Sequence, residues 1–337
     1  MRINIITWCV FAGSMAVLCH GYAQDQNCNH ISIINYLDST KSERITTIQY
    51  YDGLGRLDQT VTGGANTVGT YIYRHVQYDS AERESVKWCP FSASTYTPDY
   101  IAVSDIGAES QTTRGYDDFS CSRMTYDALD RISSITTPGA AWANIPQTIT
   151  YRSNTAADSV RKYLASNPLN YVYYEADRLE CKDVVDEEGL HVTIFIDFLG
   201  RTILERKSKN TTRLDTYYVY DDHDFLTYVL PPKYSAIESP TQSDLDALAY
   251  QYTYNNQGLA LTKKLPGAAV IEYGYDMAGK MVRMRDGLLR GKGLYRFFMY
   301  DRMGRLCVQG TTSTRYDQSY KSDYVSLAIS GTGFLGS

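Results

Sequence analysis

The stretch Tyr51-Asp52-Gly53-Leu54-Gly55-Arg56-Leu57 decides the fold of this chain, because its pattern recurs along the sequence. An aromatic residue, an acid, two variable residues and a glycine return as Tyr275-Asp276-Met277-Ala278-Gly279 and as Tyr300-Asp301-Arg302-Met303-Gly304. Weaker copies begin at Tyr78, Tyr126, Ile196, Tyr220 and Tyr254. Recurrence of one short motif indicates a chain built from repeated structural units.

Each copy predicts a three-residue β-hairpin loop, in which a type I turn is followed by a residue in the left-handed conformation. An acid or amide at the first turn position accepts backbone hydrogen bonds, and a glycine three positions later adopts positive φ without a Cβ clash. Where glycine is missing, Asp130 and Asp224 tolerate this conformation, whereas Glu82 does so poorly. The structural turn positions assigned in this way are Asp52, Gly55, Arg56, Asp127, Asp197, Gly200, Arg201, Gly258, Asp276, Gly279, Asp301, Gly304 and Arg305.

Tyrosine is the outlier of the composition, with 31 of 337 residues. Before the turns tyrosines recur with period two, as at Tyr250, Tyr252 and Tyr254, which places them on one face of a strand. A tyrosine ring can be buried while its hydroxyl stays hydrated, so it suits a sheet with one packed face. The predicted fold is all-β, an array of β-hairpins that must stack to bury a core.

These residues resemble the YD repeat of the Rhs family, in which a Tyr-Asp pair is followed by Gly-Arg and a hydrophobic strand. The resemblance begins near Tyr50 and covers most of the chain that follows. In that family the repeats form a β-ribbon that spirals into a hollow shell, often around a C-terminal toxin, and related shells occur in insecticidal toxin complexes and teneurins. The resemblance implies a curved or spiralling sheet and a partial shell, either the N-terminal part of such a protein or a truncated member, because the copies are few and no Asp-Pro-x-Gly closing segment is present.

The N-terminus fits a secretory signal peptide, residues 1–23, with Arg2, an apolar run and cleavage after Ala23. A lipoprotein alternative would use Cys19, but Leu18 stands where a small residue is expected. No later segment approaches the roughly 18 apolar residues that span a bilayer. We therefore expect a mature chain that is secreted or held in the cell envelope, without a transmembrane segment.

The rest of the chain is predicted to contain three regions. Residues 24–190 form an N-terminal β region with degenerate repeats and an insertion, residues 191–310 form the repeat array, and residues 311–337 form an irregular tail. Short helices are expected near 156–165 and after a capping Ser243. The five cysteines after the signal peptide show no CxxC spacing and are predicted to be mostly isolated and buried: Cys28, Cys89, Cys121, Cys181 and Cys307.

Two stretches resemble chemical sites. Residues 274–281 match a phosphate-binding loop except at the last position, where Met281 lacks the oxygen that a magnesium ion needs. Residues 221–224, Asp-Asp-His-Asp, could offer ligands to a divalent cation, but they fall on a repeat turn. The histidines lack an HExxH arrangement, and no GxSxG motif is present. We predict no catalytic, cofactor-binding or metal-binding residues, and no enzyme activity.

Charge is unevenly distributed in a chain of formal net charge −5. The stretch from Lys280 to Arg305 is strongly basic, and the stretch from Asp177 to Glu188 is acidic. In a secreted acidic chain, basic residues at repeat positions do not indicate nucleic-acid binding. Opposite charges along one array favour self-association, or docking of an effector, through an open sheet edge.

The function that the sequence favours is a non-catalytic, secreted β-repeat scaffold, part of an Rhs-type shell that encloses, displays or delivers a partner or effector. The alternative is a surface glycan-binding module in which exposed tyrosine ladders stack on carbohydrate.

Overall fold

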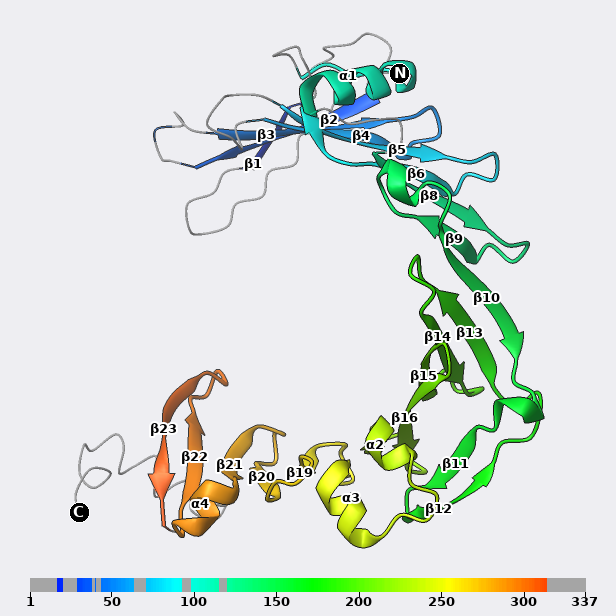
Figure 1. Ribbon diagram of the computed structural model, residues 1–337. Helices are drawn as coiled ribbons and strands as arrows, with labels where there is room; N and C mark the ends of the chain where they lie inside the picture. Colours follow the sequence, from blue (N-terminus) through cyan, green and yellow to red (C-terminus); the bar gives the residue numbers. More distant parts are fainter. Residues whose placement is uncertain are drawn as a thin grey trace. The chain divides into compact units, whose positions relative to one another are not determined.

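The computed structural model describes residues 17–20, 29–37, 40, 44–63, 71–92, 98–114 and 120–313 (Figure 1). The chain divides into two compact units, and each is described by itself. Unit 1 comprises Met1–Thr150 with Val184–Gly189, and unit 2 comprises Tyr151–Asp183 with Leu190–Ser337. Both consist mainly of antiparallel strands, which confirms the predicted all-β hairpin fold.

Unit 1 is a meander in which strands pair antiparallel with their neighbours. The pairing runs from β1 to β6, skips to β8, and continues through β9 to β10, while β7 pairs with β5. Its elements are β1 (Val17–His20), β2 (Asn29–Tyr36), β3 (Arg44–Tyr51), β4 (Leu57–Gly63), β5 (Ile72–Tyr78), β6 (Glu84–Trp88), β7 (Phe91–Ser92), α1 (Val103–Arg114), β8 (Cys121–Tyr126), β9 (Ile132–Thr136), η1 (Ala140–Trp142) and β10 (Gln147–Ser153), which continues into unit 2.

Unit 2 continues the same construction. Strands β14 to β23 pair antiparallel in chain order, and β11 and β12 form a separate hairpin. Its elements are η2 (Ala156–Asp158), β11 (Arg161–Leu164), β12 (Asn167–Tyr173), β13 (Glu180–Val185), which ends in unit 1, β14 (His191–Ile196), β15 (Thr202–Lys209), β16 (Thr212–Tyr220), β17 (Leu226–Leu230), α2 (Pro232–Ser235), α3 (Gln242–Leu248), β18 (Tyr250–Tyr254), β19 (Ala260–Lys264), β20 (Ile271–Tyr275), β21 (Met281–Arg285), α4 (Gly287–Gly291), β22 (Tyr295–Tyr300) and β23 (Leu306–Thr312).

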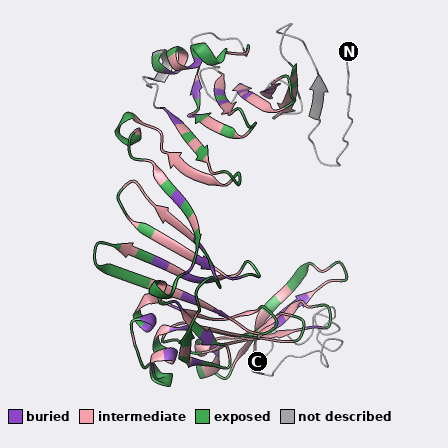
Figure 2. Ribbon diagram, turned by 90° about the vertical axis from the view of Figure 1, so that its right-hand side faces the viewer, coloured by how far each residue is buried: buried purple, intermediate pink, exposed green. Residues whose placement is uncertain are grey.

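Each unit has its own core. In unit 1, Ile106 of α1 packs against sheet residues that include Tyr50 and Tyr73. In unit 2, Tyr163 of the β11–β12 hairpin and Tyr234 of α2 pack with Tyr217 of β16. Most strand residues are only partly buried, as Figure 2 shows. The cores therefore form where a helix or hairpin covers the sheet.

The structure corrects the predicted helices. The expected helix near 156–165 is wrong, because only the three-residue η2 forms and a strand follows it. Helix α3 begins two residues earlier than expected: Thr241, not Ser243, is the capping residue, and its hydroxyl accepts the Asp244 backbone N–H at 3.3 Å. Helix α1 was not predicted, because its sequence shows no apolar periodicity. Among its described residues, Ile106 is the only buried hydrophobic one.

Other predictions fall partly outside the described residues. Of residues 1–23 only Val17–His20 is described, as strand β1, and of residues 311–337 only 311–313, where β23 ends. The cleavage site lies outside the described residues, so the signal peptide stays a prediction. Cys121 and Cys181 are buried, as predicted, whereas Cys89 is only half-buried and Cys307 is exposed; Cys28 lies outside the described residues. Burial raises the pKa of the Cys181 thiol to about 11.

Candidate functional site: the repeat turns and their ladder

All eight repeat copies form the same hairpin loop. In each, the backbone N–H of the first turn residue bonds to the carbonyl four residues later, and the fourth residue bonds back to the first. The fourth residue has positive φ in every copy, from 61° at Asp130 to 84° at Gly304. Even Glu82, the least suitable residue by sequence, adopts φ of 66°. The assigned positions all lie in these loops.

The turn aspartate holds its loop together with both carboxylate oxygens. In the first copy, Asp52 Oδ1 accepts the backbone N–H groups of Leu54 and Arg56, each at 2.9 Å, and Oδ2 accepts Arg56 Nε at 2.7 Å. The hydrogen bond from the Arg56 backbone lowers the pKa of Asp52. The same aspartate–arginine pair recurs at Asp79, Asp127, Asp197 and Asp301. The acid and the base of the motif are therefore partners of each other.

The repeat tyrosines connect successive copies, a feature that the sequence reading missed. Arg56 lies over the Tyr78 ring, 4.3 Å from its centroid, and the Tyr78 hydroxyl donates to the Leu57 carbonyl at 2.8 Å. We call this set of contacts the tyrosine ladder. Its other hydroxyl bonds run from Tyr126 to Glu84, Tyr220 to Thr202, Tyr254 to Leu226 and Tyr300 to Met281. Arginine or lysine covers the ring of Tyr126, Tyr220 and Tyr300, and Phe225 stacks on Tyr254.

A ninth turn of this kind lies between β13 and β14 in the described part of the chain. Glu188 N–H donates to Asp186 Oδ1 at 2.9 Å, and Gly189 adopts φ of 76°. It falls in the long interval between the copies at Tyr126 and Ile196. Val185 stands where the motif has an aromatic residue, and Leu190 where it has arginine, so only the Asp-x-x-Gly spacing could have revealed it.

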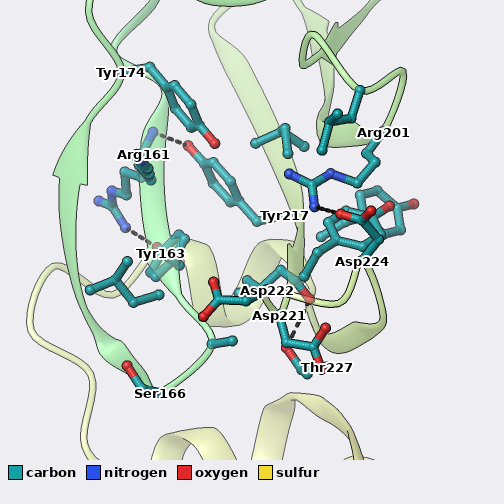
Figure 3. Close-up of a pocket in the computed structure, with 18 residues that line it drawn as sticks. Arg161, Tyr163, Ser166, Tyr174, Arg201, Tyr217, Asp221, Asp222, Asp224 and Thr227 are labelled. Atoms are coloured by element: carbon teal, nitrogen blue, oxygen red, sulfur yellow. Dashed lines mark hydrogen bonds and ion pairs between the residues drawn. The ribbon is translucent and has the colours of Figure 1, made fainter. Parts of the chain in front are cut away.

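A pocket of about 780 Å³ lies in unit 2 between the β11–β12 hairpin and the β16–β17 turn (Figure 3). Arg201 on its wall pairs with Asp197 at 2.6 Å and with Asp224 at 2.5 Å. Lys162 and Arg201 cover the rings of Tyr174 and Tyr220. Arg161 also lines this pocket and has no carboxylate partner among the described residues, so the paired groups on the wall are those of Arg201 and its two aspartates.

The two sequence stretches that resembled chemical sites each contain a repeat turn. Asp221 binds the backbone N–H groups of His223 and Phe225, each at 2.9 Å, and Asp224 pairs with Arg201. Among the described residues no group of three or more His, Cys, Asp or Glu side chains could hold a metal ion. Residues 274–281 form the end of β20, a turn and the start of β21, so the element that follows Gly279 is a strand and not a helix.

The chain was compared with protein families and with curated proteins. Residues 27–155 match the family described as a domain of unknown function, DUF6443. Among curated proteins, no sequence matches the chain. In the described residues no helix is long and apolar enough to cross a membrane.

Solved structures of Tc toxin complexes resemble the chain in fold. A TcdB2-TccC3-TEV structure matches 86% of this chain and 14% of its own, at 15% identity and a TM-score of 0.56. A TcdB2-TccC3 structure matches 90% of this chain and 15% of its own, at 12% identity and a TM-score of 0.56. A Photorhabdus luminescens Tc holotoxin pore with a substituted TccC3 matches 86% of this chain and 14% of its own, at 16% identity and a TM-score of 0.52. The chain thus spans about a seventh of these chains, and it has an Rhs-like β-fold.

Proposed function

We propose that the chain is a segment of a non-catalytic, secreted β-repeat scaffold of the Rhs type, which encloses, displays or delivers a partner or effector. The tyrosine ladder is the observation that carries this proposal. The recurring tyrosines, aspartates and arginines bond to their own loop or to the preceding copy, as at Tyr78, Asp52 and Arg56. Side chains that make these bonds hold each turn and its neighbouring repeat copy together, and they are not available as nucleophile, base or ligand.

The hairpin tips support a role in contact with another protein. In unit 2 the exposed fractions of Phe198, Met277 and Met303, at the tips of three repeat turns, are 90%, 87% and 80%. Contiguous exposed apolar surface marks interaction sites, and we propose that these three tips contribute to one. A scaffold that holds a polypeptide has a use for such positions, whereas an isolated soluble domain does not.

The proposal is tested on the complete exported protein, purified from the fraction in which it accumulates. We expect Gln24 at its N-terminus and a stoichiometric polypeptide partner in the complex. Breaking the ladder with Tyr220→Phe together with Arg201→Gln should release that partner, and the nearby control Tyr218→Phe should not. A protein that elutes alone at every stage, or one that turns over a substrate, would contradict the proposal.

The glycan-binding alternative does not fit the ladder itself, because each ladder hydroxyl is bonded and cations or Phe225 cover most of its rings. One tyrosine outside the ladder favours it. Tyr173, at the end of β12, has 57% of its surface exposed.

A further inference from the structure

A second, smaller pocket of unit 2, about 330 Å³, lies beside Tyr173. The β11–β12 region contributes Ser159, Arg161 and Tyr173, β16 contributes Arg213 and Asp215, and the segment after α2 contributes Glu238. The volume falls within the usual range of small-molecule sites, about 300–1,000 Å³. None of these residues belongs to the repeat motif, so the scaffold role leaves them unexplained.

Two arginines, Arg161 and Arg213, and two carboxylates, Asp215 and the exposed Glu238, line this pocket, and Arg206 lies outside its lining. Asp215 is almost buried, and both Arg206, at 2.9 Å, and Arg213, at 2.6 Å, pair with it. Burial opposes the ionisation of Asp215, but the hydrogen bonds from Arg213 and Arg206 prevail and lower its pKa. One carboxylate is thus shared by two guanidinium groups, which leaves one positive charge without a partner.

Arg161 adds a second unbalanced cation. Its Nη1 donates to three neutral oxygens, those of the Tyr163 hydroxyl at 3.2 Å, the Ser235 carbonyl at 2.9 Å and the Ile237 carbonyl at 3.3 Å. No carboxylate pairs with it in the described part of the chain. Its guanidinium group stacks over Tyr171, 4.2 Å from the ring centroid, which fixes its plane. A fixed planar guanidinium group is suited to a carboxylate, which it binds through two parallel hydrogen bonds.

Tyr173 supplies an apolar wall. Its ring packs edge-on against Tyr171, with the ring centroids 5.7 Å apart and an interplanar angle of 78°. This contact holds the ring while more than half of its surface stays exposed. A held, exposed aromatic ring beside polar groups can stack on the C–H face of a pyranose.

We propose that this pocket binds a saccharide that carries a carboxylate, such as a uronic acid residue of a glycan. The carboxylate faces Arg161 and Arg213, the sugar ring stacks on Tyr173, and Ser159 and Glu238 bond to sugar hydroxyls. Glu238 is exposed at the rim, and with Asp215 it disfavours a dianion such as phosphate. This activity goes beyond the scaffold role and does not depend on it.

Calorimetric titration at low salt tests the site, with glucuronate, glucose and inorganic phosphate as probes. We expect glucuronate to bind at least about tenfold more tightly than glucose, since its carboxylate makes charge-assisted hydrogen bonds. It should also bind at least about tenfold more tightly than phosphate, which has no ring to stack on Tyr173 and whose second charge Glu238 and Asp215 repel. Arg161→Gln, Arg213→Gln and Tyr173→Ala should each weaken glucuronate binding about tenfold or more. Glu238→Gln removes a repulsive charge and should strengthen it severalfold.

The matched control is Arg178→Gln, which removes an exposed arginine of the same unit that pairs with Glu175 outside the pocket. It should leave glucuronate binding unchanged, and circular dichroism should show each variant folded. Equal binding of glucose and glucuronate, or phosphate competing as well as glucuronate, would overturn the acidic-sugar assignment. Absence of binding to the folded wild-type protein would overturn the site itself. Either result leaves the test of the scaffold, which reads out a polypeptide partner, unaffected.

Discussion

The Tyr78 hydroxyl donates a hydrogen bond of 2.8 Å to the backbone carbonyl of Leu57, which precedes it by 21 residues. The ring that carries this hydroxyl lies under the guanidinium group of Arg56, in the preceding repeat copy. A phenylalanine would keep the ring contact but lose the hydrogen bond, whereas tyrosine makes both. This double role gives a physical reason for tyrosine at the first position of the motif.

The first prediction concerns one bond of the ladder. Tyr254→Phe removes the hydrogen bond from the Tyr254 hydroxyl to the Leu226 carbonyl, which is 2.8 Å long. We expect the free energy of unfolding to fall by about 1 kcal/mol, the usual net value of such a bond. The control is Tyr252→Phe in the same strand, since no described residue bonds to that hydroxyl. Urea unfolding of both variants checks this, and equal losses would argue against the ladder.

The second prediction separates backbone strain from packing in one turn. Gly53 and Gly55 both face open space, but only Gly55 has positive φ, at 80°. Gly55→Val should therefore lower the free energy of unfolding by about 1–3 kcal/mol. Gly53→Val should change it much less, because no left-handed conformation is forced on valine there. Similar midpoints of urea unfolding for the two variants would show that the left-handed residue is placed wrongly.

The third prediction runs in the opposite direction. Glu82 holds φ of 66° in a turn where most other copies have glycine. Glu82→Gly should raise the free energy of unfolding by about 0.5–1 kcal/mol, because relief of the left-handed strain exceeds the entropy that glycine adds to the unfolded chain. Asp130 is a less suitable position, since its carboxylate accepts Arg83 Nη1 at 2.6 Å. A lower thermal midpoint for the Glu82 variant would count against this reasoning.

The fourth prediction is a dependence of stability on pH. His75 in unit 1 is fully buried, with its Nδ1 at 3.4 Å from Asp58 Oδ1, and Asp58 also accepts the Tyr100 hydroxyl at 2.5 Å. Burial lowers the pKa of His75 below its ordinary 6.5, although the Asp58 charge partly opposes this. Below pH 6.5 the unfolded chain therefore takes up a proton that the folded chain resists, so stability falls as the pH falls.

Between pH 7.5 and 5.5 the loss should reach about 1 kcal/mol, measured by urea unfolding. His75→Gln should flatten this dependence, whatever it does to stability at neutral pH. His223→Gln, at an exposed turn position, should leave it as in the wild type. A pH dependence that survives in the His75 variant would assign it to other groups.

The parts of the structure that the sequence predicted are those fixed by local chemistry. An Asp-x-x-Gly turn is determined within a few residues: Asp52 binds N–H groups no more than four positions away, and Gly55 needs only its own freedom of φ. Such interactions form wherever the residues occur. The eight motif copies therefore located hairpins correctly, even at Glu82.

The parts that could not be predicted depend on contacts between distant residues. The ladder joins Tyr126 to Glu84, 42 positions apart, and no local pattern shows which copies become neighbours. Helix α1 is defined by burial of Ile106 against a sheet that the periodicity of its own sequence does not reveal. The smaller pocket of unit 2 is likewise made by Arg161 and Arg213, which come from separate hairpins.

The last prediction is self-association through a sheet edge. Within the described residues β23 pairs with β22 alone, and a strand paired on one side offers unpaired backbone groups to another chain. The basic stretch from Lys280 to Arg305 includes the turn before β23. Arg305 is paired with Asp301 and holds that turn, whereas Arg302 at its tip pairs with no described residue.

Arg302→Glu therefore reverses a charge beside β23 without removing the Asp301–Arg305 pair, and it should weaken self-association severalfold. Lys233→Glu makes the same charge change on α2, away from β23, and should have no such effect. Added salt should weaken association of the wild type, because exposed charges are screened beyond about 10 Å at 0.1 M. Sedimentation velocity over a range of concentrations measures all three. A monomer at every concentration and salt level would mean that the edge of β23 is protected, and an equal effect of the two reversals would mean that net charge alone governs association.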